Sequence, residues 1–265
     1  MAENLRIVIT AGGTSEPIDE VRCISNRSSG RLARAIAGRL FEIGGRSVER
    51  LYYIHGPGAS LPETPRTILA PVETVKDLSE FLSSLLRGGG VSAIVHAMAV
   101  SDYRVAGVAS IESISAAIAH ALSCGALRPS VKENALAGAI GRIIAKTHSI
   151  ASGKIPSDIE DPVLLLDRTP KVISGLRTAA PKAVIVGFKL LCGVEEGELV
   201  GAGLRLLGAT RCSYVFANDA RAAFGSGHAG FLVAPDGSYE RLEGIDEIAQ
   251  RVAETVLRDA GGGDL

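Results

Sequence analysis

The chain has 265 residues with 46% hydrophobic content, and its 28 basic and 29 acidic side chains give a formal net charge of −1. This balance excludes the strongly basic surface that is typical of nucleic-acid-binding proteins. The longest apolar runs have the length of a strand, far below the roughly 18 residues that cross a bilayer, and the start of the chain lacks signal-peptide features. We therefore expect a cytoplasmic protein that binds neither membranes nor nucleic acids.

Strand-length apolar runs alternate with amphipathic helices along most of the chain. The predicted strands are 5–10, 48–54, 67–70, 93–100, 163–166, 183–188 and 214–217. The predicted helices begin near Ser28, Val75, Pro170 and Glu195, and glycines end the first two. Because such alternation is typical of right-handed βαβ units, we expect an α/β fold with a Rossmann-like, doubly wound, mostly parallel sheet in three αβα layers.

Three segments depart from this alternation. Residues 11–29 lack a clear pattern and are predicted to form a long loop. Two consecutive amphipathic helices between residues 111 and 146 predict a helical insertion over about residues 107–150. Residues 231–234 and 238–242 predict a C-terminal β-hairpin, followed by a helix around 248–256. We expect residues 1–265 to form a single domain.

The spacing of cysteine and histidine indicates no metal site. The four cysteines form no CxxC pair, and the five histidines form no HxH or HxxxH pair. We therefore expect neither a zinc site nor a disulfide framework, and no metal ion that is bound by protein side chains.

The loop after the first strand is a candidate ligand site, because ligands bind beyond the carboxyl ends of strands in a doubly wound sheet. Gly12 and Gly13 allow close approach of the backbone, and Ser28, Ser29 and Gly30 precede a helix whose free N–H groups favour an anion. Alternatively, Ser28 only caps the helix and the glycines only form a turn. We favour a phosphate site, because long loops in compact domains are usually functional.

Three further regions carry polar side chains where strands or loops end. Asp102 follows a run of small residues, and its carboxylate could accept hydrogen bonds from a ligand or cap a local turn. Lys154, Lys171 and Lys189 could together neutralise phosphate, although a single lysine is more often a solvated surface charge. Asn218 could bind a base or ribose, or form a turn.

Six motifs are spread from about residue 5 to residue 260. They are Ile9-Thr-Ala-Gly-Gly-Thr, Ile18-Asp-x-Val-Arg-x-Ile-x-Asn-x-Ser-Ser-Gly30, Ala99-Val-Ser-Asp-Tyr103, Thr169-Pro-Lys-Val-Ile173, Val186-Gly-Phe-Lys-Leu190 and Ala217-Asn-Asp219. Together these motifs resemble the phosphopantothenate-cysteine ligases. The free-standing form fits better than the form fused to a decarboxylase, because the variants at 169–171 and 188–190 resemble the unfused branch.

The resemblance implies a ligase that joins 4′-phosphopantothenate to L-cysteine in coenzyme A biosynthesis. In this family the substrate carboxylate attacks the α-phosphate of CTP or ATP, pyrophosphate leaves, and the cysteine amine then displaces the nucleoside monophosphate. The activation is needed because a carboxylate is a poor electrophile. The resemblance also implies Mg²⁺ with the nucleotide and a homodimer.

The resemblance also implies a role for each matching residue. Asn26 would hold the activated carboxyl group by donating its amide to the oxygen, and Lys154 would act from a mobile flap. Contacts to the substrate would come from Asn26, from Met98, Ala99 and Asp102, and from Arg22 across the dimer interface. Contacts to the nucleotide would come from Gly12, Ser28, Gly30, His96, Ala97, Lys154, Lys171, Phe188, Lys189, Arg205 and Asn218.

Three positions depart from the pattern of the family. Ala33 replaces a frequent glycine, Ala209 replaces a frequent basic residue, and Lys154-Ile-Pro-Ser retains one lysine of a lysine-rich stretch. These differences bear on the affinity for the nucleotide and on its choice.

Two other classes of function compete with the ligase. A short-chain-type reductase that uses NAD(P) would need a tight glycine turn leading into the first helix and a lysine four residues after a tyrosine, but Gly107 stands four residues after Tyr103. A non-catalytic nucleotide-binding module would be expected to lose Asn26 or Lys154, which this chain keeps.

Overall fold

The computed structural model describes residues 4–127, 133–147, 154–156, 158–221 and 228–261. The chain divides into two compact units. The first unit comprises Met1–Ser15, Ser25–Ser101 and Pro170–Leu265, and the second comprises Glu16–Ile24 and Asp102–Thr169. That residues 1–265 form a single domain stays a prediction.

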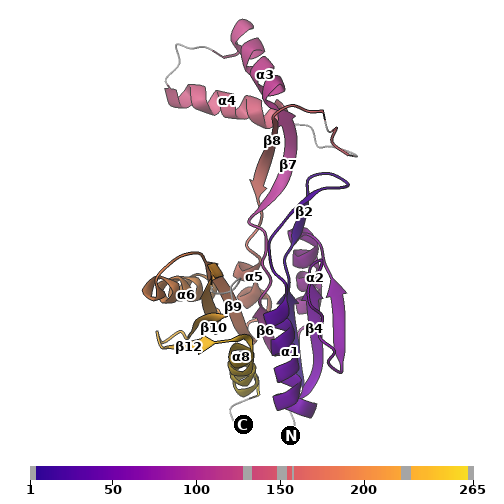
Figure 1. The fold of residues 1–265 in the computed structure, drawn as a ribbon, viewed down its shortest axis with the longest axis vertical. Coiled ribbons are helices and arrows are strands. Elements are labelled where there is room, and N and C mark those ends of the chain that lie inside the picture. The colour runs from indigo at the N-terminus through magenta and orange to yellow at the C-terminus, as the bar shows by residue number, and fades with distance from the viewer. Residues whose placement is uncertain (1–3, 128–132, 148–153, 157, 222–227, 262–265) are drawn as a thin grey trace. The chain divides into compact units, whose positions relative to one another are not determined.

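The first unit is built on an eight-stranded sheet (Figure 1). Its strands, from one edge to the other, are β5 (Thr67–Pro71), β4 (Val48–His55), β1 (Leu5–Ala11), β6 (Ala93–His96), β9 (Val184–Leu191), β10 (Tyr214–Asp219), β11 (Ala229–Val233) and β12 (Tyr239–Glu243). The first six are parallel, and β10, β11 and β12 pair antiparallel. In chain order the parallel strands follow the 3-2-1-4-5-6 arrangement of the Rossmann fold, which confirms the predicted doubly wound sheet and the hairpin at its end.

Helices cover both faces of this sheet and complete the three predicted layers. One face packs against α1 (Arg31–Gly44) and α8 (Ile245–Ala260), and the other packs against α2 (Val75–Arg87), α5 (Val172–Ala179) and α6 (Glu196–Thr210). Within β1, Ile7 and Ile9 join the first core and Val8 joins the second, and all three are fully buried. A parallel strand buried on both faces therefore appears as an unbroken apolar run, and each such side chain contributes about 1.5–3 kcal/mol to stability.

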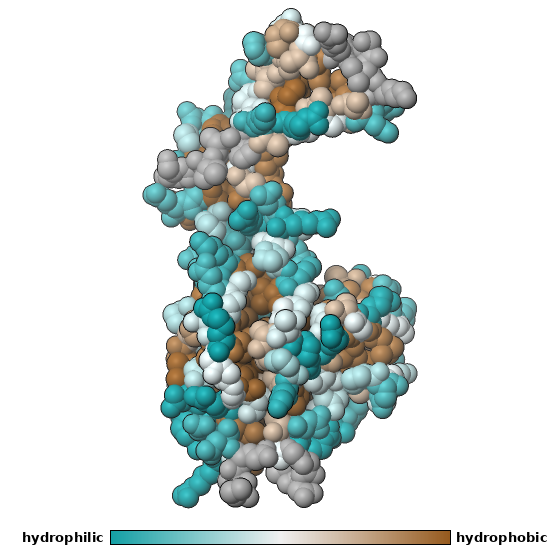
Figure 2. Space-filling view, turned by 180° about the vertical axis from the view of Figure 1, so that it is seen from behind, coloured by the Kyte–Doolittle hydropathy of each residue, from teal (hydrophilic) through white to brown (hydrophobic). Residues whose placement is uncertain are grey.

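The second unit contains an antiparallel ribbon of β7 (Tyr103–Ser110) and β8 (Pro162–Arg168), with α3 (Ile111–Ser123) and α4 (Glu133–Thr147) between them in the chain. The two helices confirm the predicted helical insertion. The prediction that residues 163–166 return to the main sheet is wrong, because β8 pairs with β7, a strand that the apolar pattern did not indicate. Apolar side chains stay exposed on this ribbon, including Leu164 and Leu166, and Figure 2 shows brown surface in this part of the chain.

The predicted long loop over residues 11–29 contains two short strands. These are β2 (Ser15–Pro17) and β3 (Cys23–Ser25), which pair with each other. The following helix α1 begins at Arg31, and its N-cap is Gly30 with φ 69°, without a hydrogen bond from a capping side chain. The alternative in which Ser28 caps this helix is therefore wrong. None of the described helices is long and apolar enough to cross a membrane.

Candidate functional site

The candidate site lies where the order of the parallel strands reverses. After β1 the chain continues through α1 to β4, whereas β6, on the other side of β1, is followed in the sheet by β9. The chain therefore continues from β1 and from β6 toward opposite edges of the sheet, and open α/β sheets bind ligands at such reversal points. Residues 12–14 and 97–101 form these two loops.

Backbone hydrogen bonds join the two loops beyond the sheet. The N–H of Ala99 donates to the carbonyl of Gly12 at 2.8 Å, and the N–H of Thr14 donates to the carbonyl of Ala99 at 3.2 Å. The hydroxyl of Thr14 accepts the N–H of Ser101 at 2.9 Å. Two of the predicted substrate-binding residues, Met98 and Ala99, therefore belong to a segment that is hydrogen-bonded to the first loop.

Asn26 is hydrogen-bonded to both loops. Its N–H donates to the carbonyl of Thr14 at 3.3 Å, and its Nδ2 donates to the carbonyl of Ala99 at 3.2 Å. The Asn26 side chain is nevertheless exposed. Because an amide group carries two N–H donors and an acceptor, one donor anchors the side chain and the other remains available to a ligand.

A third loop, residues 56–60 after β4, completes the packing around the glycines. The N–H of Ser60 donates to the carbonyl of Ser29 at 2.9 Å, and the N–H of Gly56 donates to the carbonyl of Ala11 at 3.0 Å. A Cβ atom on Gly13 would overlap the carbonyl oxygen of Asn26, and one on Gly56 would overlap the carbonyl oxygen of Gly13. The glycines are therefore required by the close contact of three backbone segments.

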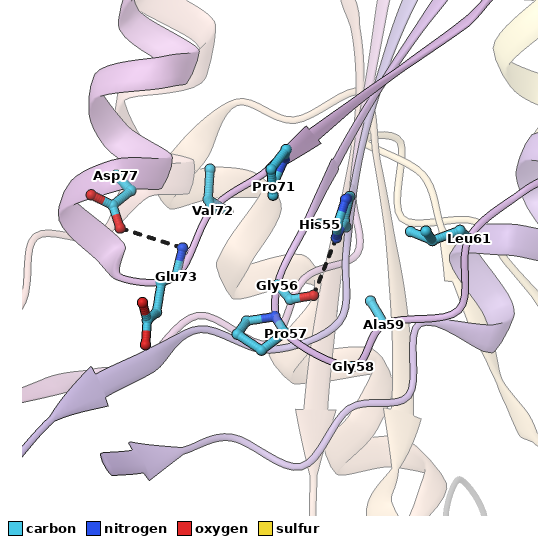
Figure 3. Close-up of a pocket in the computed structure, with 10 residues that line it drawn as sticks. All are labelled: His55, Gly56, Pro57, Gly58, Ala59, Leu61, Pro71, Val72, Glu73 and Asp77. Carbon is cyan, nitrogen blue, oxygen red and sulfur yellow. Dashed lines mark hydrogen bonds between the residues drawn. The ribbon is translucent and has the colours of Figure 1, made fainter. Parts of the chain in front are cut away.

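A pocket of about 540 Å³ opens beside this third loop, at the carboxyl ends of β4 and β5 (Figure 3). His55, Gly56 and Ala59 line it from one side, and Glu73 and Asp77 line it from the start of α2. The N–H of Thr74 donates to Asp77 at 2.9 Å and lowers the pKa of this carboxyl group, which caps α2. The volume suits a small organic ligand.

His96 ends β6 and is buried. Its Nδ1 lies 2.9 Å from Oγ1 of Thr10, and the same oxygen accepts the N–H of Met98 at 3.2 Å. Burial lowers the pKa of His96 from its usual 6.5 to about 4, so the ring is neutral at pH 7. The hydroxyl of Thr10 then donates to an unprotonated Nδ1, an assignment that follows from the hydrogen-bond network.

This neutral ring makes the stability of the protein depend on pH. His96 of the unfolded chain binds a proton below about pH 6.5, whereas His96 of the folded chain stays neutral down to about pH 4. The free energy of unfolding therefore decreases as the pH falls from about 6.5 to about 4. We expect His96 to account for a loss of about 2 kcal/mol in the free energy of unfolding between pH 7 and pH 5. Urea denaturation of the wild type and of His96→Gln measures this difference.

The control for this measurement is His120→Gln, because His120 is exposed on α3. It should keep the pH dependence of the wild type, whereas His96→Gln should lose about 2 kcal/mol of it. Equal pH dependence in the wild type and in His96→Gln would contradict the assignment of a neutral, buried ring.

The residues predicted to contact the nucleotide lie in several places. Phe188 is half-buried on β9 and packs against Phe216 with ring centroids 5.6 Å apart, and Asn218 is buried in β10. Lys189 is half-buried on β9, and Lys171 is exposed at the N-terminus of α5. Arg205 is exposed in the second half of α6, and because that helix runs back toward the amino ends of the strands, it lies away from the edge that carries the loops.

Three of the predicted site residues belong to the second unit. Asp102 is exposed, and its carbonyl accepts the N–H of Thr169 at 3.0 Å. Arg22 forms an ion pair with Asp19 of its own turn at 2.5 Å, and Lys154 is exposed beside the buried Ile155. Their predicted contacts with substrate and nucleotide stay predictions.

Sequence reasoning did not single out several residues that organise the site. Thr10 and Thr14 bind the neighbouring loop through their hydroxyl groups, and Gly56 allows the third loop to approach. Asp19 belongs to one of the six motifs, but the resemblance implies no role for it. The available signal was its position three residues before Arg22, a spacing that suits a local ion pair.

The reductase alternative finds no support in the geometry. Tyr103 lies in β7 of the second unit, and Gly107 follows it in the same strand. The first loop contains the β2–β3 pair instead of a tight turn into α1. Among the described residues, no group of three or more His, Cys, Asp or Glu side chains gathers as a metal site would.

Comparison with known proteins agrees with the fold and the motifs. Residues 2–115 match the family profile described as DNA/pantothenate metabolism flavoprotein C-terminal domain. The coenzyme A biosynthesis bifunctional protein CoaBC of Thermococcus kodakarensis is 30% identical over 224 residues, which cover 84% of this chain and 43% of that protein. The chain therefore spans less than half the length of this curated relative.

Solved structures share the fold. The DNA/pantothenate metabolism flavoprotein from Streptococcus pneumoniae is 27% identical with a TM-score of 0.75, covering 95% of this chain and 98% of that chain. The Cab2 mutant H337A in complex with phosphopantothenate-cysteine has a TM-score of 0.65 at 18% identity, covers 98% of this chain and 87% of that chain, and shows a shared fold. These findings confirm the resemblance that the motifs indicate.

Proposed function

We propose that this chain, as a relative of the C-terminal domain of pantothenate metabolism flavoproteins, is a phosphopantothenate-cysteine ligase. It would join 4′-phosphopantothenate to L-cysteine through an acyl-nucleotide. The observation that supports this most is Asn26, which is anchored by Thr14 and Ala99 at the reversal point of the sheet and keeps one amide donor available.

The proposed chemistry needs a group that stabilises oxygen charge. The carboxylate of phosphopantothenate attacks the α-phosphate of a nucleoside triphosphate and pyrophosphate leaves. The amine of cysteine then attacks the acyl carbon, loses a proton, and displaces the nucleoside monophosphate. Negative charge develops on the carboxyl oxygen in this second step, and a preorganised donor such as Asn26 stabilises it without reorganisation. Met98, Ala99 and Asp102 would contact the pantothenate arm.

CTP or ATP is the proposed co-substrate. Gly12, Ser28 and Gly30 meet at the N-terminus of α1, where free N–H groups favour phosphate oxygens. His96 and Ala97 follow in the next loop, and the ring of Phe188, the amide of Asn218 and the charges of Lys171 and Lys189 complete the proposed set. Mg²⁺ would enter with the triphosphate, since it usually binds through substrate phosphates and water, and it would neutralise phosphate charge.

Lys154 and Arg22 complete the proposal. Lys154 would neutralise phosphate charge during activation of the carboxylate, and Arg22 would contact the substrate across the interface of a homodimer. Arg22 has a half-exposed side chain, so part of its guanidinium can reach a ligand while Nε and Nη2 bind Asp19.

The test is pyrophosphate release from the purified chain with 4′-phosphopantothenate and Mg²⁺, with and without cysteine, and with CTP or ATP in separate reactions. We expect release that depends on phosphopantothenate, and its rate identifies the nucleotide. Lys154→Gln should slow release about 10²-fold or more, because a charge that stabilises the transferring phosphate is lost. No release with either nucleotide would overturn the proposed function.

The matched control is Lys182→Gln, which removes the same charge from an exposed position between α5 and β9. It should release pyrophosphate at the rate of the wild type. An equal decrease in both variants would contradict a specific role for Lys154.

A further inference from the structure

The carboxylate of Asp19 is the most highly connected acidic group among the described residues of the second unit. Its side chain has no exposed surface. Oδ1 accepts the backbone N–H groups of Val21 at 2.8 Å and Arg22 at 2.7 Å. Oδ2 accepts Nε of Arg22 at 3.0 Å, Nη2 of Arg22 at 2.5 Å and the backbone N–H of Ile155 at 3.0 Å. A buried carboxylate is tolerated only when it is satisfied in this way.

Asp19 and Arg22 together hold both polar groups of one distant peptide residue. Asp19 accepts the N–H of Ile155, and Nη2 of Arg22 donates to the carbonyl of Ile155 at 2.8 Å. The side chain of Ile155 is buried. The orientation of the backbone at Ile155, and with it the point from which Lys154 extends, is therefore set by this ion pair.

The negative charge of Asp19 is required for this arrangement. The hydrogen bond from the guanidinium of Arg22 is the main reason that the pKa of the Asp19 carboxyl group lies well below its usual range. The carboxylate therefore stays ionised at every pH near neutrality. A neutral amide of the same shape could still accept the N–H groups of the turn. It could not accept a hydrogen bond at the atom that faces both Arg22 and Ile155, because that atom would itself be a donor.

We propose that Asp19 is a positioning residue of the ligase reaction, which fixes Arg22 and the Lys154-Ile155 segment in one arrangement so that both cations act in the activation of the carboxylate. The inference rests on the proposed function, because that function assigns Lys154 and Arg22 their roles. Asp19 binds the guanidinium of Arg22 directly, and it binds the backbone N–H of Ile155, the residue that follows Lys154. The two cations therefore come from segments that are far apart in the chain.

The first test is Asp19→Asn, assayed by pyrophosphate release with phosphopantothenate and the nucleotide that supports the wild type. We expect kcat to decrease about 10- to 100-fold, since misplacing a catalytic group by about 1 Å has an effect of this size, with little change in KM. The matched control is Glu20→Gln, which makes the same change in the exposed neighbour and should keep the wild-type rate.

A double-mutant cycle separates positioning from general stability. Because Asp19 acts in part through Lys154, the further decrease in rate caused by Asp19→Asn should be smaller in Lys154→Gln than in the wild type. The amide hydrogen of Ile155 should also exchange faster in Asp19→Asn, because its acceptor is lost. If Asp19→Asn does not fold by circular dichroism, Asp19→Glu takes its place, and its loss of rate should be matched by faster exchange at Ile155.

Three outcomes would overturn the inference. These are a wild-type rate in Asp19→Asn, multiplicative effects in the double variant, and loss of rate with unchanged exchange at Ile155. An inactive wild type would instead overturn the proposed function, and the role of Asp19 would fall with it. The two failures are distinguishable, because only the second abolishes pyrophosphate release in the wild type and in Glu20→Gln alike.

Discussion

Asn26→Asp should decrease formation of phosphopantothenoylcysteine about 10²- to 10³-fold, the usual effect of removing one donor to a developing oxyanion. The substitution keeps the size of the side chain but removes both N–H donors. It also places a carboxylate oxygen against the carbonyl of Ala99, which now accepts a hydrogen bond from Nδ2. The side chain should therefore turn away from Ala99 as well as lose its ability to donate. Product formation at saturating nucleotide and cysteine measures the effect.

The control for Asn26 is Asn134→Asp, because Asn134 is exposed in the first turn of α4 and undergoes the same chemical change. It should have the activity of the wild type. Circular dichroism should show both variants folded, since the side chain of Asn26 is itself exposed. Turnover by Asn26→Asp within a few-fold of the wild type would contradict the role of its amide.

Among the described glycines of the first unit, Gly56 should be the one whose replacement by alanine is the most destabilising. The added Cβ would overlap the carbonyl oxygen of Gly13, and this contact is between backbone atoms, so no side chain can move aside. Gly13 is in turn fixed by Asn26, whose carbonyl it touches. We expect a loss of at least about 3 kcal/mol in the free energy of unfolding, at the upper end of the cost of overpacking, together with loss of activity.

The control for Gly56 is Gly58→Ala, two residues along the same loop. No heavy atom lies within 4 Å of its added Cβ, and the only cost is its φ of 67°, about 1–2 kcal/mol. Urea denaturation gives both free energies. Equal destabilisation by the two substitutions would show that the three loops are not as tightly packed as the structure indicates.

The parts of the fold that follow from local pattern could be predicted. Ile7, Val8 and Ile9 are buried on both faces of the sheet, so they read as a continuous apolar run followed by a glycine turn. The ribbon strand β8 looks similar, but Leu164 and Leu166 are exposed and its partner β7 lies about sixty residues earlier. An apolar run does not reveal which strand it pairs with, and for that reason the sequence pattern places residues 163–166 in the wrong sheet.

The site was predictable to a similar degree. The motifs assign Asn26 and Ala99 to one substrate site, and a hydrogen bond joins these two residues in the structure, whereas their contacts with a substrate stay predictions. The start of α1 could not be derived from composition, because serines precede the helix in the sequence whereas its N-cap in the structure is a left-handed glycine. The role of Asp19 depends on Ile155, a contact between residues too distant in the chain for any local pattern to indicate.

The central position of β6 in the sheet affects how the chain folds during its synthesis. Its two neighbours are β1, which precedes it, and β9, which begins only at Val184. While a ribosome synthesises residues 97–183, for on the order of ten seconds, β6 remains an apolar edge with unpaired N–H and C=O groups. Such an edge can pair with a neighbouring nascent chain. We therefore expect the yield of folded protein to depend on chaperones that bind during this interval.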